Sequence, residues 1–144
     1  MQRFLIFIIF FISFQIVSSQ EQKTAFHSLD VFSLEWASNP QISPDASQII
    51  YRRNGFDIMK DNPKGNLWIL NSDGSLHRKL TSREVNESQA KWSPNGDRIA
   101  FVSSTDEGSE LYMYWVKTGQ IAKLSQLEMS PGNITWSPDG KQIA

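Results

Sequence analysis

The chain has 144 residues, 40% hydrophobic and 12% aromatic, a composition typical of one globular domain. Its 14 Lys and Arg residues nearly balance 15 Asp and Glu residues, and the formal net charge of -1 excludes the basic surface expected of a nucleic-acid-binding protein. Cysteine is absent, which excludes disulfides, thiolate metal sites and a cysteine nucleophile. Because His27 and His77 lack further ligands at metal spacing, we expect no metal site and no cofactor.

Residues 1–19 have the pattern of a signal peptide. A short positive segment ends at Arg3, an apolar run extends from Phe4 to Val17, and small residues follow up to Ser19. In a helix this run would reach roughly 21 Å, which is short of a hydrocarbon core of about 30 Å. We therefore expect a cleaved export signal, no stable membrane anchor, and a mature chain that begins at Gln20 in the bacterial periplasm or exterior.

After a lead-in segment at residues 20–38, one phrase recurs three times along the chain. It occurs as ISPDASQIIY, WSPNGDRIAF and WSPDGKQIA, and the serines of its Ser-Pro pairs, Ser43, Ser93 and Ser137, are spaced by 50 and 44 residues. Short runs of β-branched and aromatic residues that recur at such a period are typical of propeller blades. We predict an all-β fold, a partial β-propeller of four-stranded antiparallel blades over residues 39–144.

The predicted blades can be placed along the chain by their turn residues. Blade 1 covers about 39–82, blade 2 about 86–126, and blade 3 begins at about 130–144. In blade 1 the strands are expected at 40–42, 48–52, 66–70 and 77–81, with a long connection from Arg53 to Gly65; in blade 2 they are expected at 90–92, 98–103, 110–116 and 121–125. No helical periodicity is predicted after residue 20. Seven blades of about 44 residues need roughly 310 residues, so we expect about two and a half blades of a truncated, longer product.

The Ser-Pro-Asp/Asn-Gly sequence in each repeat predicts a tight turn. Proline presets φ, Asp or Asn bonds back to the backbone, and glycine accepts a positive φ. We interpret the serine as a turn cap and not as a nucleophile, because no histidine base or oxyanion hole accompanies it. Ala46 stands where the other repeats have Gly96 and Gly140, and a left-handed alanine there would weaken the first blade by about 1 kcal/mol.

Aromatic and polar residues outside the turns are candidates for contacts. Trp92 and Trp136 recur at one position of the repeat, and Trp68 occupies a third-strand position equivalent to Tyr112, so we predict that these tryptophans pack between neighbouring blades. The polar residues Asp57, Lys60 and Asp61 and the run at 105–110 could contact a substrate or a cation. Solvated loop charge is the simpler interpretation for them.

The repeats resemble those of a known group of proteins. The segments NPQISPDASQIIY, NLWILNSDG and AKWSPNGDRIAFVSS are similar to the propeller repeats shared by TolB-like proteins and by the N-terminal domain of prolyl oligopeptidase family serine peptidases. The lead-in FHSLDVFSLEWASNPQISPD resembles the opening of acylaminoacyl-peptidase-like members of that family. A TolB-like protein is expected to carry a small α/β domain before its first blade, so the peptidase is favoured.

This resemblance implies an exported serine peptidase whose propeller gates the entry of peptides to a catalytic α/β-hydrolase domain with Ser, Asp and His. The chain contains no Gly-x-Ser-x-Gly sequence, so we assign no catalytic, cofactor-binding or metal-binding residue, and whether the chain itself is an enzyme stays open. The alternative is a TolB-like periplasmic scaffold that binds another envelope protein. A degraded reading frame without function is the third hypothesis.

Overall fold

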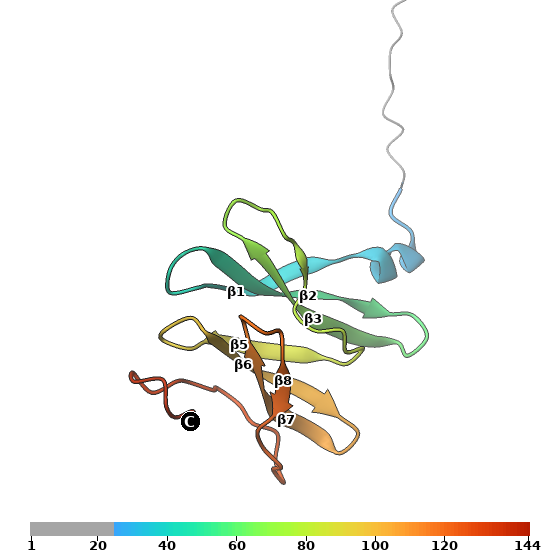
Figure 1. Cartoon of the computed structure of the whole chain (residues 1–144). Helices are drawn as coiled ribbons and strands as arrows, with labels where there is room; N and C mark the ends of the chain where they lie inside the picture. The colour runs from blue at the N-terminus through green and yellow to red at the C-terminus, as the bar shows by residue number, and fades with distance from the viewer. Residues whose placement is uncertain (1–24) are drawn as a thin grey trace, which may run out of the picture.

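The computed structural model describes residues 25–144, so the predicted signal peptide at residues 1–19 lies outside the described residues. A short 3-10 helix, η1 (Ser28–Ser33), precedes eight strands that form two four-stranded sheets (Figure 1). Strand order follows the chain in both sheets, and neighbouring strands are antiparallel. The prediction of an all-β fold built from four-stranded antiparallel blades is confirmed.

The two sheets are called the first and the second blade below. The first contains β1 (Trp36–Ile42), β2 (Gln48–Asp57), β3 (Asn62–Asn71) and β4 (Arg78–Lys79). The second contains β5 (Glu87–Trp92), β6 (Arg98–Thr105), β7 (Gly108–Trp115) and β8 (Ile121–Lys123). In both blades the first strand is bulged. Its register against the next strand shifts between Ser38 and Gln41 in β1 and between Ser88 and Lys91 in β5.

The long connection predicted from Arg53 to Gly65 is wrong. These residues extend β2 and β3 into one uninterrupted antiparallel hairpin. Gly65, which the prediction treated as a loop residue, lies inside β3, where a Cβ atom would come within 2.4 Å of the guanidinium carbon of Arg52. At this position glycine leaves room for the Arg52 side chain, which would have to move if a Cβ atom were present, and it does not mark a turn.

The Ser-Pro turn has one geometry in all three repeats. The fourth residue of the turn is left-handed, with φ values of 58° at Ala46, 73° at Gly96 and 67° at Gly140, and its N–H donates to the serine carbonyl at 2.9 Å. The serine hydroxyl accepts a hydrogen bond of 2.9 to 3.0 Å from the N–H of the residue five positions later. The serines are therefore turn caps, as predicted, and Ala46 has the left-handed conformation predicted for it.

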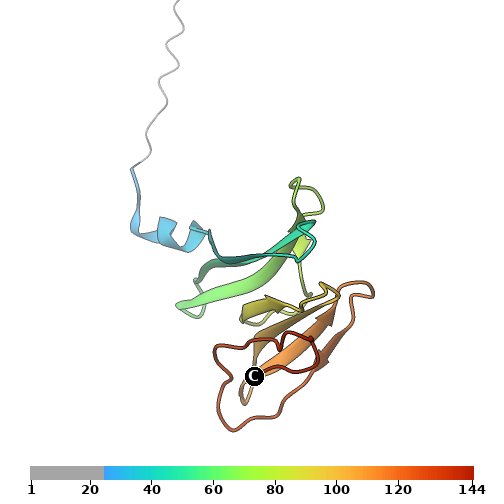
Figure 2. The same ribbon diagram turned by 90° about the vertical axis from the view of Figure 1, so that its left-hand side faces the viewer.

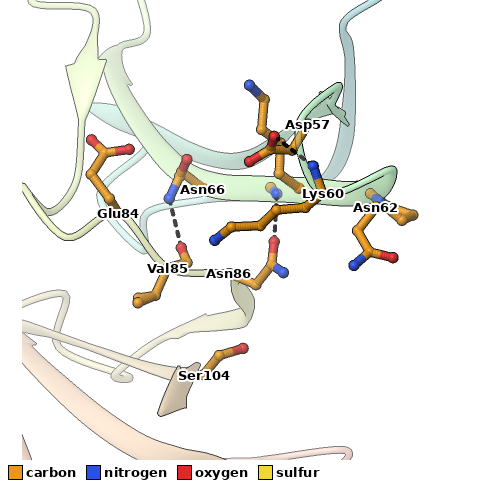
Figure 3. A pocket seen from close by; sticks show the side chains of 11 residues that line it. Asp57, Lys60, Asn62, Asn66, Glu84, Val85, Asn86 and Ser104 are labelled. Atoms are coloured by element: carbon orange, nitrogen blue, oxygen red, sulfur yellow. Dashed lines mark hydrogen bonds between the residues drawn. The ribbon is translucent and has the colours of Figure 1, made fainter. Parts of the chain in front are cut away.

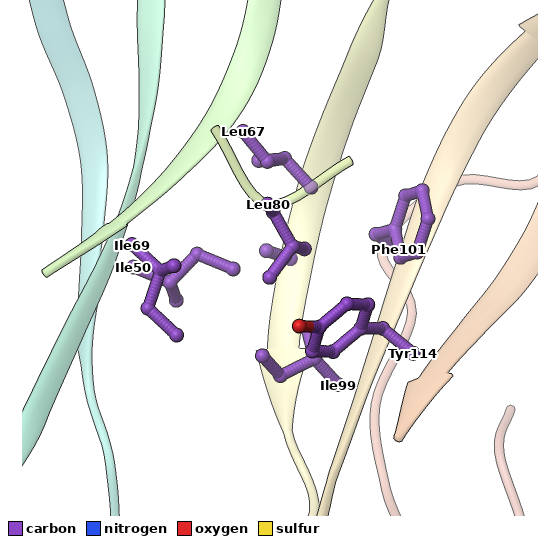
Figure 4. Packing of buried hydrophobic residues seen from close by; sticks show 8 residues of the cluster. Ile50, Leu67, Ile69, Leu80, Ile99, Phe101 and Tyr114 are labelled. Carbon is purple, nitrogen blue, oxygen red and sulfur yellow. The ribbon is translucent and has the colours of Figure 1, made fainter. Parts of the chain in front are cut away.

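A hydrophobic core fills the space between the two blades (Figure 4). Figure 4 shows Leu80 between the isoleucines of the first blade and Tyr114 of the second. Burial of such side chains contributes about 25 cal/mol per Å² of apolar surface, and this contact therefore stabilises the pair of blades as one unit. The buried members of the cluster are Ile50, Leu67, Ile69, Leu80, Ala90, Ile99, Phe101 and Tyr114.

Two contacts between neighbouring units recur at the repeat period. The indole N–H of Trp92 donates to the carbonyl of Gln41 at 3.3 Å, and that of Trp136 donates to the carbonyl of Lys91 at 3.1 Å. The turns also stack, because a Cβ atom on Gly96 would lie 3.4 Å from the Pro44 Cδ of the preceding turn. The prediction that the recurring tryptophans pack between blades is confirmed for Trp92 and Trp136, and Figure 2 shows the units stacked in this order.

Trp68 lies on the other face of the first blade. Its neighbours Leu67 and Ile69 face the second blade, so the alternation along β3 directs Trp68 to the opposite face of the first blade. There its ring centroid lies 5.0 Å from that of His77 and 4.7 Å from the guanidinium carbon of Arg53. The described residues form no blade on this face, so the predicted packing of Trp68 between neighbouring blades stays a prediction.

The third repeat begins in the same way as the first two. Trp136 and Ile143 form an antiparallel bridge, and Thr135 and Ala144 exchange two backbone hydrogen bonds of 2.8 and 3.0 Å. Ile134 is buried in a second small cluster with Ala100 and Val102 of β6. The second blade is therefore covered on both faces, by the first blade and by the third repeat.

The lead-in segment docks on the first blade through η1, a short helix that the sequence patterns did not predict. The ring of Phe32 lies edge-on to Phe56 of β2, at 6.4 Å between centroids, and Trp36 lies 5.6 Å from the same ring. Figure 1 shows that η1 and the tips of the β2–β3 and β6–β7 hairpins lie at one end of the blades, opposite the Ser-Pro turns. This end is called the hairpin end below.

Candidate functional site

A cavity of about 340 Å³ opens at the hairpin end, between the β2–β3 hairpin and the segment that links β4 to β5 (Figure 3). Its lining is mostly polar, and acidic and basic side chains are both present. A site of this kind can hydrogen-bond a polar group or a main chain, but it has no apolar pocket that would anchor a large hydrophobic ligand. The polar lining residues are Asp57, Lys60, Asn62, Lys64, Asn66, Glu84, Asn86 and Ser104.

Hydrogen bonds between the first blade and the segment before β5 fix the wall of this cavity. The Gly65 N–H donates to Asn86 Oδ1 at 2.8 Å, and the Asn66 side chain donates to the carbonyl of Val85 at 2.8 Å (Figure 3). These bonds join β3 to the segment before β5 and so hold two sides of the cavity together. Its side chains include a serine, but no histidine lines the cavity to serve as a base.

The structure brings together only some of the polar residues singled out in the sequence. Asp57 and Lys60 line the cavity, and Asp57 Oδ1 accepts a hydrogen bond of 3.3 Å from the Lys60 N–H. Asp61 lies in the hairpin turn with a left-handed φ of 47° and is not among the lining residues. Glu110, the last residue of the run at 105–110, is buried in β7 and accepts a hydrogen bond of 2.6 Å from Ser125. The run is therefore only partly a solvated loop.

A buried carboxylate beside the cavity was not predicted. Glu87 opens β5 and is 1% exposed, and it accepts hydrogen bonds from the Thr81 hydroxyl at 2.5 Å and the Leu67 N–H at 3.2 Å. Burial raises the pKa of Glu87, although these hydrogen bonds and the nearby positive charges of Arg83 and Lys79 oppose the rise. Glu87 thus joins β3 and the end of β4 to the second blade, and no motif in the sequence marks this role.

The two histidines differ in how they are bonded. His77 Nε2 lies 2.7 Å from the Tyr51 hydroxyl, whereas at His27 the backbone N–H donates to the Asp30 carboxylate at 2.8 Å at the start of η1. Within residues 25–144, no group of three or more His, Asp or Glu side chains could hold a metal ion. In the same part of the chain no helix is both long and apolar enough to cross a membrane.

The strand order and the blade period are those of a partial β-propeller. The chain is 27% identical over 115 residues to the uncharacterized peptidase YuxL of Bacillus subtilis, covering 79% of this chain and 18% of that protein. It is 32% identical over 111 residues to dipeptidyl-peptidase 5 of Porphyromonas gingivalis, covering 77% of this chain and 16% of that protein. No family model matches the chain.

Solved structures show the same fold at lower sequence identity. The acylaminoacyl peptidase of Pyrococcus horikoshii matches with a TM-score of 0.66 at 15% identity, over 79% of this chain and 17% of that one. The propeller domain of the trilobed protease from Pyrococcus furiosus matches with a TM-score of 0.61 at 16% identity, over 76% of this chain and 32% of that one.

TolB of Alcanivorax borkumensis is also similar, with 36% identity over 76 residues, covering 51% of this chain and 18% of that protein. The chain thus spans less than a fifth of the length of each of these curated relatives. The resemblance to the propellers of prolyl oligopeptidase family peptidases, with TolB-like repeats as further relatives, is confirmed.

Proposed function

We propose that this chain forms the first blades of the propeller of an exported serine peptidase of the prolyl oligopeptidase family, and that the propeller controls the access of peptides to a catalytic α/β-hydrolase domain. The observation that carries the proposal is the similarity to two proteins named as peptidases over 79% and 77% of the chain. The nucleophile would be a serine on the strained turn of the hydrolase domain. The described blades would act by shape, admitting short peptides and excluding folded proteins.

The hairpin end is the surface that we assign to the contact with the hydrolase domain. The lead-in helix η1 and the two hairpin tips lie there (Figure 1), and residues of the β2–β3 hairpin line the polar cavity at this end. A polar, charge-balanced surface suits a contact between domains that must separate, since such interfaces are more polar than obligate ones.

A serine-reactive probe tests this proposal on the native product. An antibody raised against the second blade isolates the protein from the source organism, and a fluorophosphonate labels any activated serine in it. We expect a labelled product larger than 16.5 kDa, the mass of this chain, and loss of labelling after heat denaturation. A stable product that the probe never labels would overturn the peptidase assignment.

A TolB-like scaffold is the second candidate, because the similarity to TolB reaches 36% identity over 76 residues. A scaffold of that kind would bring down another envelope protein with the antibody and would not react with the probe. Export is tested separately by determining the N-terminal residue of the secreted or periplasmic product. We expect Gln20, and a product that retains Met1 would overturn the export proposal.

A further inference from the structure

Strands β1 and β5 each contain a left-handed residue that is not glycine, and the third repeat has one at the equivalent position. Asn39, Gln89 and Asn133 have φ values of 51°, 54° and 55°, and they are spaced by the same 50 and 44 residues as the Ser-Pro turns. This conformation strains residues with a Cβ atom, and glutamine more than asparagine. Glycine would form the bulges of β1 and β5 without that strain, so the bulge alone does not explain the amide side chains. Strain that recurs in this way is typical of functional positions.

These three residues border one groove. A groove of about 500 Å³ runs across β1, β5 and the segment before Trp136 in the third repeat. Lys91 is the single charged residue of its lining, and no aromatic residue lines it. A ligand held by ring stacking is therefore disfavoured. The polar lining consists of Asn39, Gln41, Gln89, Lys91, Asn133 and Thr135.

Some polar side chains of the groove already form hydrogen bonds within the protein, and others do not. Gln89 Oε1 accepts a hydrogen bond of 2.7 Å from the Asn133 N–H, so Gln89 joins the second blade to the third repeat. Among the described residues, none forms a hydrogen bond with the side chains of Asn39, Gln41 or Lys91. A side-chain amide offers two N–H donors and one carbonyl acceptor, and an ammonium group offers three donors. These groups are therefore available to a ligand.

We propose that this groove binds an extended peptide through its main chain, with a carboxylate of the peptide placed on Lys91. Each peptide residue supplies one donor and one acceptor, which amide side chains match whatever the peptide sequence. The ammonium group adds a charge-assisted hydrogen bond to the carboxylate. The groove thus selects for an unfolded main chain and for negative charge, and it does not select for particular apolar side chains.

This inference rests on the proposed function for the class of ligand, a peptide, and adds where the peptide binds and which charge it carries. The two proposals fail separately. Labelling by the fluorophosphonate reports on a hydrolase domain, whereas binding of a peptide to this chain reports on the groove.

The test is an NMR titration of the ¹⁵N-labelled chain with acetyl-tetra-alanine that ends in a free carboxylate, compared with the same peptide ending in an amide. We expect shifts of the side-chain amide signals of Asn39 and Gln41, and about three- to fivefold tighter binding of the carboxylate form. In Lys91→Met this preference disappears. In Asn39→Gly, which keeps the bulge and relieves its strain, both peptides bind about fivefold more weakly.

Lys117→Met is the control for Lys91→Met, and either of two results would overturn the proposal. Lys117→Met removes an exposed lysine from the β7–β8 turn and leaves both affinities unchanged. If Asn39→Gly and Lys91→Met, both folded by their amide spectra, bind the two peptides as the unchanged chain does, the groove is not the site. If tri-galacturonic acid shifts the groove signals and neither peptide does, the ligand is an acidic sugar and the assignment to a peptide is overturned.

Discussion

The two described blades share their strand order but differ in what covers them. The second blade lies between the first blade and the third repeat, whereas described residues cover only one face of the first. At equivalent positions the first blade has Ile42 instead of Trp92 and Tyr51 instead of Phe101. Ile42 is 65% exposed and Phe101 is fully buried. Ile42 and Tyr51 thus lie on the face of the first blade that no described unit covers, whereas Phe101 lies in the contact between the two blades.

The largest effect is expected from Phe101, because it lies inside the contact between the blades. Phe101→Ala should lower the free energy of unfolding by about 3 to 5 kcal/mol, since it leaves a cavity in the core. The matched change Tyr51→Ala removes a half-buried ring and the contact with His77, and it should cost only about 1 to 2 kcal/mol. Urea unfolding measures both. Equal losses would contradict the proposed difference between the two faces.

A smaller loss of stability is expected when only the hydrogen bond between the blades is removed. Trp92→Phe retains an aromatic ring but removes the N–H that bonds to the Gln41 carbonyl, so we expect a loss of about 1 to 2 kcal/mol. Trp68→Phe is the matched control, because Trp68 lies on the other face of the first blade. It should cost clearly less in the same urea experiment, and a larger loss for Trp68→Phe would show that the two tryptophans have been assigned to the wrong faces.

Two substitutions in the turns should change the free energy of unfolding in opposite directions. Ala46→Gly should raise the free energy of unfolding by about 1 kcal/mol, because the native φ of 58° strains alanine. Gly96→Ala should lower it by about 1 kcal/mol or more, since the φ is 73° and the new Cβ atom would lie 3.4 Å from Pro44. Thermal unfolding followed by tryptophan fluorescence checks the signs. Destabilisation by Ala46→Gly would mean that Ala46 makes a contact worth more than its strain.

The smallest effect concerns the pH dependence of the contact at Glu87. A carboxyl group with a raised pKa in the folded chain favours folding most when it is protonated, so its contribution is lost as the pH rises through the folded pKa. Relative to Glu87→Gln, the free energy of unfolding of the unchanged chain should therefore fall as the pH rises above about 4.5, the ordinary pKa. Urea unfolding at several pH values measures this difference, and a difference that grows with pH would contradict a raised pKa.

The sequence predicted those parts of the structure that depend on local chemistry. The period of the Ser-Pro pairs, the turn at Gly96 and the position of Trp92 follow from residues whose backbone or side-chain preferences are strong. The β2–β3 hairpin was missed because Gly65 is typical of a loop, whereas in the structure Gly65 lies within β3 beside the Arg52 side chain. Sequence patterns alone cannot reveal such a contact.

The candidate sites were predicted less well than the fold. The bulge residues Asn39 and Gln89 recur at the repeat period, but neither is a glycine, so nothing marked them as left-handed. Glu87 resembles any surface glutamate in the sequence and becomes a buried link only when the first blade meets β5. The sites arise from contacts between units, and these contacts depend on how the blades pack.

The measurement that tests the peptidase assignment most directly is the nucleotide sequence of the source locus beyond the codon for Ala144. The account predicts that the same frame, or the frame restored after a local error, continues through further Ser-Pro-Asp-Gly repeats into a Gly-x-Ser-x-Gly sequence between a predicted strand and a predicted helix. A locus in which the repeats continue and then stop, with no such sequence after them, would contradict the peptidase assignment and leave the scaffold.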